Sequence, residues 1–213
     1  MESLELMPVR VRVTAILKKA IYAGEYKSGE ELSLTGIAEK LGISRTPVRE
    51  AFQALEAEGL ITLRMNRGAI VNTIDRKFIT DIFDLRILLE GEAAERAAMA
   101  GPDVSALLEA ASAMAARTEP IEKADYEELN QKIHLAIWKA ADNRRLYACL
   151  MELWNGPSTG LSPSEIQEHY RLSTAEHIRI LEAGRDGNRE EARSWMRAHI
   201  ERSKRNTLQF YPD

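Results

Sequence analysis

Cysteine is almost absent from this chain of 213 residues. The single cysteine, Cys149, excludes an internal disulfide and a cysteine-based zinc cage. The apolar runs fall far short of the ~18 residues that a membrane-spanning helix needs. Residues 1–12 carry charged side chains and lack the apolar region of a signal peptide, so we expect no secretory signal. These scarcities predict a reduced, soluble, cytoplasmic protein with no membrane partner.

Apolar and charged residues are both plentiful. With 45% hydrophobic and 29% charged residues, the chain can bury a core and is not a disordered tail. Residues 1–74 carry 10 Lys and Arg against 9 Asp and Glu, whereas residues 75–213 carry 19 against 24. The overall acidity argues against a general nucleic-acid coat, but it leaves room for a small, locally basic surface that reads a duplex.

The first third of the chain predicts three helices and a hairpin. Apolar side chains recur at helical spacing over residues 9–21. Ser33 and Ser44 are each typical of the residue that caps a following helix. The runs 60–63 and 69–71 then read as two short strands joined by a turn. Three helices and a hairpin in about 70 residues are the plan of a winged helix-turn-helix.

The rest of the chain predicts helices only. Ala-, Leu- and Glu-rich stretches alternate with glycine and proline, which end helices. The expected helices span 77–100, 103–116, 121–141, 144–155, 163–184 and 188–209. Six such helices with short links form an antiparallel bundle. The predicted fold is therefore mainly α: a winged helix-turn-helix domain over 1–74, then an all-α antiparallel six-helix bundle over 75–213.

The expected helix after Ser44 turns two arginines away from its apolar stripe. At 100° per residue, Arg45 and Arg49 lie about 40° apart, with Thr46 and Gln53 beside them. Arginine suits the two acceptors that guanine presents in the major groove, and the N–H groups of a helix N-terminus favour phosphate. The alternative is an ordinary solvated helix face. The position between a helix–turn and a hairpin favours a recognition helix instead.

The hairpin offers further cations. Arg64 and Arg67 can reach a neighbouring phosphate or the minor groove, and Gly68 permits close approach there. The predicted DNA contacts are Ser44, Arg45, Thr46, Arg49, Gln53, Arg64, Arg67 and Gly68.

This segment resembles the winged-helix domain of GntR-family transcription regulators. The similarity is carried by LGISRTPVREA over 41–51, LEAEGLI over 55–61 and RGAIV over 67–71. Because such regulators bind short palindromic operators as homodimers, the resemblance implies a palindromic double-stranded DNA operator and a homodimer. It also implies that four residues lie at the usual DNA-contacting positions, namely Arg45, Thr46, Arg49 and Gly68.

Four histidines occur, all in the helical half. His134, His177 and His199 fall on three different expected helices, and such residues can converge inside a bundle. Three imidazoles with an oxygen ligand suit zinc, nickel or iron. Each histidine is, taken singly, better explained as a core-edge or surface residue, so the residues alone leave a metal site open. His169 is expected at a pocket rim or on the surface.

The helical half resembles the FCD ligand-binding domain of the FadR-type branch of the GntR family, in its six-helix VanR-like subgroup. The pattern is Asp-x-x-x-His, then Glu-His-x-x-Ile, then a late His-Ile, and it places Asn130, His134, His177 and His199 at the four metal positions. The resemblance implies a divalent metal cofactor, expected to be zinc, with nickel, iron or manganese as alternatives. Asn130 stands where the pattern has Asp, which predicts a weaker site or a metal that demands an anionic ligand. Glu127, one turn earlier, is a candidate to compensate.

Arg86 has two interpretations. It can pair with Glu90 one turn later on the same helix. It also matches a recurrent Arg-x-x-x-Glu of the family's first bundle helix, which makes it a candidate effector-binding residue.

Together these features predict a DNA-binding transcription regulator, a repressor by preference. Its operator affinity is expected to depend on a small organic acid effector, a carboxylate, bound at the metal site of the helical domain. One alternative is a winged-helix regulator whose helical domain only dimerises. A second is a three-histidine metal enzyme, which the sequence disfavours because no acid/base pair or nucleophile accompanies the histidines. We therefore predict no catalytic residues.

Overall fold

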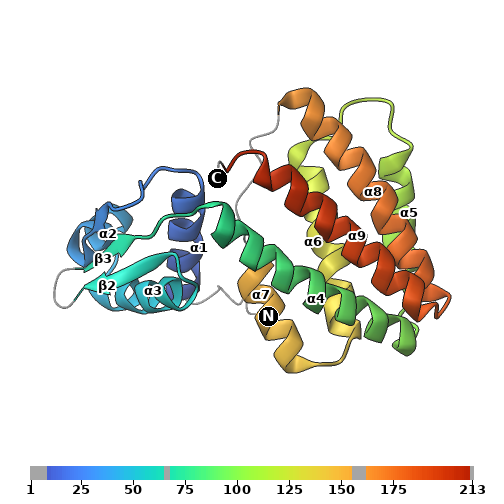
Figure 1. Cartoon of the computed structure of the whole chain (residues 1–213), viewed down its shortest axis with the longest axis horizontal. Helices are drawn as coiled ribbons and strands as arrows, with labels where there is room; N and C mark the ends of the chain where they lie inside the picture. Colours follow the sequence, from blue (N-terminus) through green and yellow to red (C-terminus); the bar gives the residue numbers. More distant parts are fainter. Residues whose placement is uncertain (1–8, 65–67, 155–161, 212–213) are drawn as a thin grey trace, which may run out of the picture. The chain divides into compact units, whose positions relative to one another are not determined.

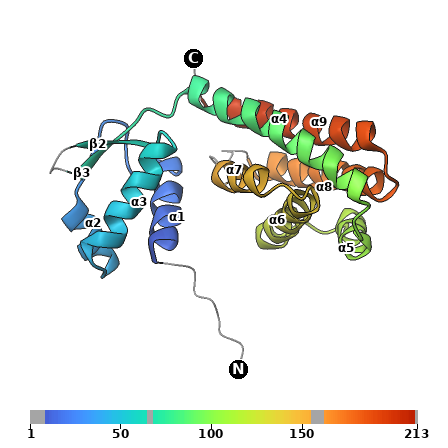
Figure 2. The ribbon, with the colours of Figure 1, turned by 90° about the horizontal axis from the view of Figure 1, so that it is seen from below.

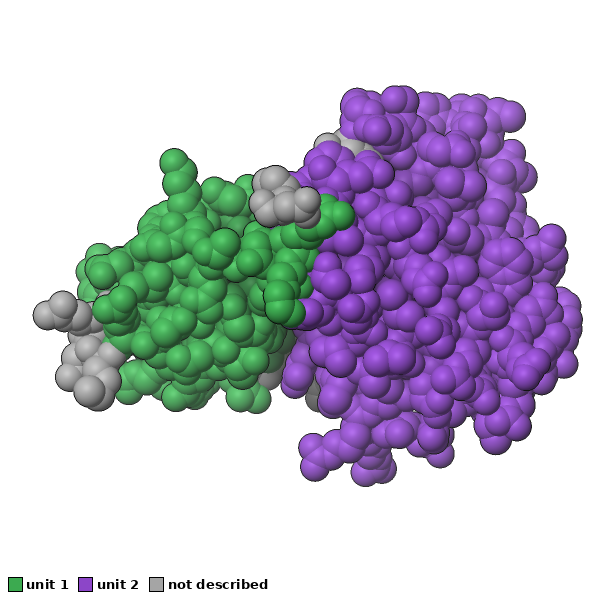
Figure 3. Space-filling model, viewed as in Figure 1, with its two compact units in different colours: residues 1–78, 155–158, 213 green, residues 79–154, 159–212 purple. Residues whose placement is uncertain are grey.

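The computed structural model describes residues 9–64, 68–154 and 162–211. These form two compact units, which are described separately here. The first contains residues 9–78, and the second contains 79–154 and 162–211 (Figure 3).

The first unit holds three helices and a three-stranded sheet (Figure 1). The helices are α1 (Val9–Tyr22), α2 (Leu34–Leu41) and α3 (Arg45–Ala57), and the strands are β1 (Glu31–Leu32), β2 (Ile61–Arg64) and β3 (Gly68–Val71). The sheet is antiparallel with the order β1-β3-β2. The predicted winged helix-turn-helix is confirmed. The expected hairpin tip, residues 65–67, lies outside the described residues.

Strand β1 was not predicted. Glu31 lies opposite Ile70 of β3, and Leu32 lies opposite Ala69. Two residues are too few to show an alternating pattern, so this stretch is typical of a turn-rich link. Leu32 is nevertheless 2% exposed, because its side chain enters the core of the unit.

The core of the first unit forms because α3 buries one face. Val48, Phe52 and Leu55 are each 0% exposed and pack with apolar residues of the other helices and the sheet. At the turn before α3, Gly42 adopts a left-handed conformation (φ 65°) and its N–H bonds back to carbonyls at the end of α2. This turn sets the start of α3 and thereby which face of α3 is left outside.

The second unit is all-α, as predicted. Its helices in the described residues are α4 (Arg76–Ala100), α5 (Ser105–Ala115), α6 (Lys123–Ala140), α7 (Arg144–Trp154), α8 (Pro163–Arg185) and α9 (Arg189–Leu208). Each lies within a turn of its expected range. The expected helix over 103–116 begins later, at Ser105, because the Asp103 carboxylate accepts the Ser105 N–H (3.0 Å) ahead of the first turn.

Helices α4, α6, α8 and α9 contribute the centre of this unit. Helix α8 packs against both α5 and α9, and α6 contacts α5, α7 and α8. Figures 1 and 2 show α4 beside α9. The approach is close at Gly91, where an added Cβ would lie 2.8 Å from Cγ of Arg197. None of the described helices is long and apolar enough to cross a membrane.

Candidate functional site

Three buried histidines meet inside the helical unit. His134 comes from α6, His177 from α8 and His199 from α9, and they are 1%, 2% and 3% exposed. Each offers one ring nitrogen within 4.8 Å of those of the other two. The Nε2 atoms of His134 and His177 are 3.3 Å apart. The structure thus brings together residues that are far apart in the sequence.

A buried carboxylate lies behind His134. Glu90 on α4 is 0% exposed, and its Oε2 accepts a hydrogen bond from Nδ1 of His134 (2.5 Å) and another from Nε1 of Trp138 (3.3 Å). Oε1 accepts from the Arg86 guanidinium at 2.8 Å. Burial would raise the pKa of Glu90, but Arg86 and His134 more than offset this effect and lower it to about 2.

A second carboxylate lies behind His199. Glu176 on α8 accepts from Nδ1 of His199 (2.7 Å), and Arg202 donates to both oxygens of Glu176 (2.6 Å each). Burial would raise the pKa of Glu176, but His199 and Arg202 lower it to about 2. Each carboxylate therefore joins one histidine to one arginine.

Two of the three histidines, His177 and His199, are held neutral. Burial lowers the pKa of His177 well below its usual value, and the neighbouring imidazoles lower it further. Burial also lowers the pKa of His199 to about 4, although Glu176 acts in the opposite direction. Neutral imidazole is the form that binds a metal ion, so these two side chains need not lose a proton at neutral pH to act as ligands.

The donor set fits a divalent metal. Two nitrogens about 2.05 Å from a tetrahedral zinc ion lie about 3.3 Å apart. This is the distance between the Nε2 atoms of His134 and His177. Since both carboxylate-bonded histidines donate through Nδ1, each keeps its lone pair on Nε2, and Nε2 of His134 lies within hydrogen-bond distance of His177.

The structure also places the other residues predicted near the metal site. Asn130 is half-buried on α6, one turn before His134. Glu127 is exposed and pairs with Lys123 at 3.5 Å, so it does not supply the charge that Asn130 lacks. His169 accepts from Arg202 (2.9 Å) and lies outside the three-histidine group, as expected for a rim residue.

Arg86 pairs with Glu90, as one of its two interpretations predicted. Its guanidinium also lies 5.3 Å from the Phe83 ring and 5.5 Å from the Trp154 ring, and its side chain is 12% exposed. The Trp154 ring lies 4.8 Å from the His134 ring. Arg86 and Trp154 therefore border the histidine cluster, and the role of Arg86 toward an effector stays a prediction.

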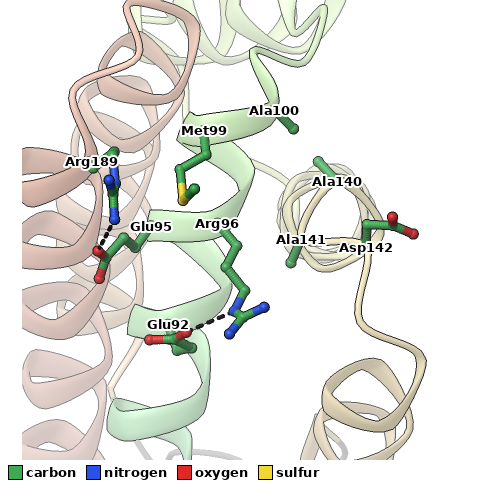
Figure 4. Close-up of a pocket in the computed structure, with 9 residues that line it drawn as sticks. All are labelled: Glu92, Glu95, Arg96, Met99, Ala100, Ala140, Ala141, Asp142 and Arg189. Carbon is green, nitrogen blue, oxygen red and sulfur yellow. Dashed lines mark hydrogen bonds and ion pairs between the residues drawn. The ribbon is translucent and has the colours of Figure 1, made fainter.

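Two surface hollows lie on the helical unit, and neither is lined by a histidine. The hollow in Figure 4 has a volume of about 560 Å³ and lies between the C-terminal part of α4, the start of α9 and the turn after α6. Four of its charged groups are already paired, Glu92 with Arg96 and Glu95 with Arg189. The other is lined by residues of α4 and α9. We assign the chemistry to the buried histidines instead, because within the described residues they form the group of side chains that could hold a metal ion.

The exposed face of α3 carries the predicted DNA contacts. Arg45, Arg49 and Gln53 are exposed, whereas Phe52 and Leu55 of the same helix are fully buried. Within the part of the chain that the structure describes, neither arginine has a hydrogen bond or an ion pair. The two guanidinium groups are therefore free to bind an acceptor from outside the chain.

The remaining predicted DNA contacts lie at the start of α3 and in the wing, and those that the structure describes differ in exposure. Ser44 occupies the N-cap position in extended conformation, as predicted, but its side chain forms no cap hydrogen bond. Thr46 and Arg64 are exposed, and Arg67 lies outside the described residues. Gly68 is buried at φ +96°, and a Cβ there would lie 2.0 Å from the Leu32 carbonyl oxygen. Glycine is thus required by the contact between β1 and β3.

Sequence reasoning missed the residues behind the histidines. Glu90 was considered only as a helical partner of Arg86, and Glu176 and Arg202 were not considered. The carboxylate of Glu176 serves His199 on another helix rather than His177, its neighbour in the sequence. Sequence spacing carries no signal for such a contact, because it depends on how α8 and α9 pack.

Comparisons with known proteins agree with this architecture. Residues 10–71 match the domain described as bacterial regulatory proteins, gntR family, and residues 81–202 match the FCD domain. An uncharacterized HTH-type transcriptional regulator of Bacillus subtilis, YdhC, is 30% identical over 194 residues, which are 86% of this chain and 84% of that protein.

One further relative is similar in sequence over part of the chain, and one solved structure is similar in fold over nearly all of it. The gluconate operon transcriptional repressor of Bacillus subtilis is 42% identical over 86 residues, which are 40% of this chain and 35% of that protein. The solved structure of E. coli McbR/YncC is 22% identical, covers 96% of this chain and 99% of that chain, and superposes with a TM-score of 0.72, which supports the fold.

These matches cover both units and most of the chain, and they describe regulators rather than enzymes. The chain belongs to the gntR family of bacterial regulatory proteins, and it is a DNA-binding transcriptional regulator with an FCD domain.

Proposed function

We propose that this protein is a cytoplasmic, homodimeric repressor. It binds a palindromic operator through α3 and the wing, and a small organic acid bound at a divalent metal in the helical unit controls that binding. The observation that carries the proposal is the coexistence of two unpaired arginines on α3 with three buried histidines in the second unit. The repressor role draws on the gluconate operon repressor named above.

The DNA contacts are proposed for α3 first. Arg45 and Arg49 can each donate two hydrogen bonds to a guanine, and a good bidentate pair is worth about 1–3 kcal/mol of discrimination. Ser44 and Thr46 lie at the helix N-terminus, where backbone N–H groups favour phosphate. Gln53, Arg64 and Arg67 complete the proposed surface, whereas Gly68 supports the wing from inside.

Binding to random-sequence duplexes, followed by selection, provides the operator for a direct test. Affinity for the selected duplex is then measured at several salt concentrations for the wild type and for Arg45→Ala/Arg49→Ala. We expect a loss of at least 100-fold. The matched control removes two arginines from α8, Arg171→Ala/Arg179→Ala, and should keep wild-type affinity. Unchanged retention by the α3 variant contradicts the proposal.

Helix α4 supports self-association. It is apolar on two sides, and on the outer side Leu85 is 50% exposed, Leu88 56% and Met99 61%. An apolar face of this kind on a surface helix marks an interaction site, and a two-fold interface uses the same face of both copies. Leu85→Glu/Leu88→Glu should produce monomers in sedimentation velocity, whereas Leu172→Glu on α8, a residue 44% exposed, should not. A dimeric α4 variant rejects this interface.

The metal is proposed to be zinc, held by His134, His177 and His199. Asn130 is proposed to supply an amide oxygen as the fourth ligand. The spacing of the Nε2 atoms supports tetrahedral coordination. Zinc prefers this geometry, whereas manganese prefers octahedral coordination. When bound, the ion would supply a positive charge for an anionic effector. Arg86 is proposed to contribute a further N–H group to that effector.

The effector can change operator affinity only if it binds two arrangements of the protein unequally. A 100-fold difference corresponds to about 2.7 kcal/mol. We propose that the arrangements differ in the spacing of the two winged helices of the dimer. A thermal-shift screen of small carboxylic acids, with zinc and with a chelator, tests this part. Stabilisation that requires zinc supports it, and no response in any condition favours a helical domain that only dimerises.

A further inference from the structure

Two carboxylates lie directly behind the histidine cluster, outside the four positions that the family pattern assigns to metal. Glu90 accepts from Nδ1 of His134 (2.5 Å), and Glu176 accepts from Nδ1 of His199 (2.7 Å). The two come from different helices, α4 and α8, and each is held in turn by an arginine. The same arrangement is therefore built twice around one cluster.

We infer that Glu90 and Glu176 are positioning residues for the metal ion. They fix His134 and His199 in the tautomer whose Nε2 lone pair faces the cluster, and they provide the negative charge that Asn130 does not. The inference rests on the proposed metal site.

The tautomer argument follows from hydrogen-bond chemistry. An ionised carboxylate only accepts hydrogen bonds, so Nδ1 of His134 and of His199 must carry the proton. The remaining lone pair is then on Nε2, the atom that in His134 lies 3.3 Å from Nε2 of His177. A carboxylate behind a histidine also raises the basicity of the imidazole, and its loss typically costs 10–100-fold in metal affinity.

The charge argument follows from Asn130. An aspartate at this position would place a carboxylate directly on the ion, whereas an amide is neutral. Glu90, which is fully buried, and Glu176, which is half-buried, each lie one imidazole ring behind the proposed ion, where charge is less screened than in water. Two carboxylates at this distance supply attraction without occupying a ligand position on the ion.

Both carboxylate oxygens of Glu90 accept hydrogen bonds, so a replacement of Glu90 must change at least one of these bonds. Its Oε1 accepts from Arg86, and its Oε2 accepts from His134 and Trp138. In Glu90→Gln the amide NH₂ must face one of these donors. If it faces Nδ1 of His134, it reverses the tautomer and turns the lone pair away from the cluster. If it faces Arg86, the tautomer survives but the charge is lost. Both outcomes weaken metal binding.

The experiment measures the zinc affinity of the metal-free, full-length protein by competition with a chromogenic chelator. The variants are Glu90→Gln and Glu176→Gln. The matched control is Glu92→Gln, which removes the same charge two residues along α4, from an exposed ion pair with Arg96 (Figure 4). We expect 10–100-fold weaker binding for the first two and a change of less than twofold for the control.

Nitrogen-15 chemical shifts of the histidine rings in the metal-free wild type provide a second readout, which does not depend on folding of the variants. We expect His134 and His199 with protonated Nδ1 and bare Nε2. Protonated Nε2 on both, or wild-type zinc affinity in both glutamine variants, overturns the inference.

The proposed metal site can be rejected separately. If the wild type and His134→Ala bind zinc equally weakly, the metal site fails and the inference falls with it. If the wild type binds zinc tightly, His134→Ala does not and the glutamine variants match the wild type, the metal site stands and the roles of Glu90 and Glu176 are rejected.

Discussion

Replacing Gly68 by alanine tests how the wing is built. The residue lies at φ +96°, where a Cβ is strained, and the added Cβ would lie 2.0 Å from the Leu32 carbonyl oxygen and 3.1 Å from its carbon. Both neighbours are backbone atoms, so no side-chain rotation can relieve the clash. Strand β1 must therefore move away from β3, although it is joined to it at only two register pairs.

The loss of stability expected for Gly68→Ala is the sum of two contributions. The left-handed backbone costs an L-residue about 1–2 kcal/mol. Overpacking against fixed atoms adds about 1–3 kcal/mol, including the strain on the β1–β3 pairing. Gly29→Ala is the matched control, because Gly29 has a similar φ of +80° but no atom within 4 Å of its added Cβ. We expect a loss of about 2–5 kcal/mol for Gly68→Ala and about 1–2 kcal/mol for Gly29→Ala.

The assay separates the two units. All three tryptophans, Trp138, Trp154 and Trp195, are in the helical unit, so tryptophan fluorescence follows its unfolding, while hydrogen exchange of peptides covering residues 29–34 and 68–72 follows the wing. Gly68→Ala should accelerate exchange in the wing and leave the fluorescence transition in urea unchanged. Equal losses of wing stability in the two glycine variants would refute the proposed contact with Leu32.

Three further predictions concern the helical unit. Arg86→Met leaves the fully buried Glu90 without its cation and should cost about 3 kcal/mol in urea unfolding followed by tryptophan fluorescence; a loss below about 1 kcal/mol contradicts the buried pair. Zinc at 1,000 times its Kd should stabilise the unit by about 4 kcal/mol, and His177→Ala should remove that gain; a gain of equal size in the variant places the metal elsewhere. Gly91→Ala brings a Cβ to 2.8 Å from Cγ of Arg197 and should cost about 1–2 kcal/mol, and Arg197→Ala should relieve part of that cost; additive losses reject the contact between α4 and α9.

Much of the fold could be predicted because helix boundaries are marked locally. Glycine at 24, 42 and 101 ends a helix, and apolar stripes at helical spacing define the buried faces between such stops. Strand β1 could not be predicted, because only its pairing with β3 makes its two residues a strand. The Ser44 side chain shows a related limit: residue type correctly indicated the N-cap position but did not determine whether the hydroxyl forms a cap hydrogen bond.

The candidate site was predictable in part. Local patterns put three histidines on three helices, but only the family resemblance indicated that they converge. Glu90 escaped notice because its pairing with Arg86 is visible along one helix, whereas its bonds to His134 and Trp138 cross to α6. A carboxylate that serves two elements at once leaves no periodic signal in the sequence, so its second role appears only in the packed structure.

The metal content of the purified protein tests the central claim most directly. Elemental analysis after reconstitution with zinc and removal of unbound metal should find one zinc ion per chain in the wild type and none in His134→Ala/His199→Ala. His169→Ala, which removes a histidine outside the cluster, should keep its zinc. The same zinc content in all three proteins would contradict the account.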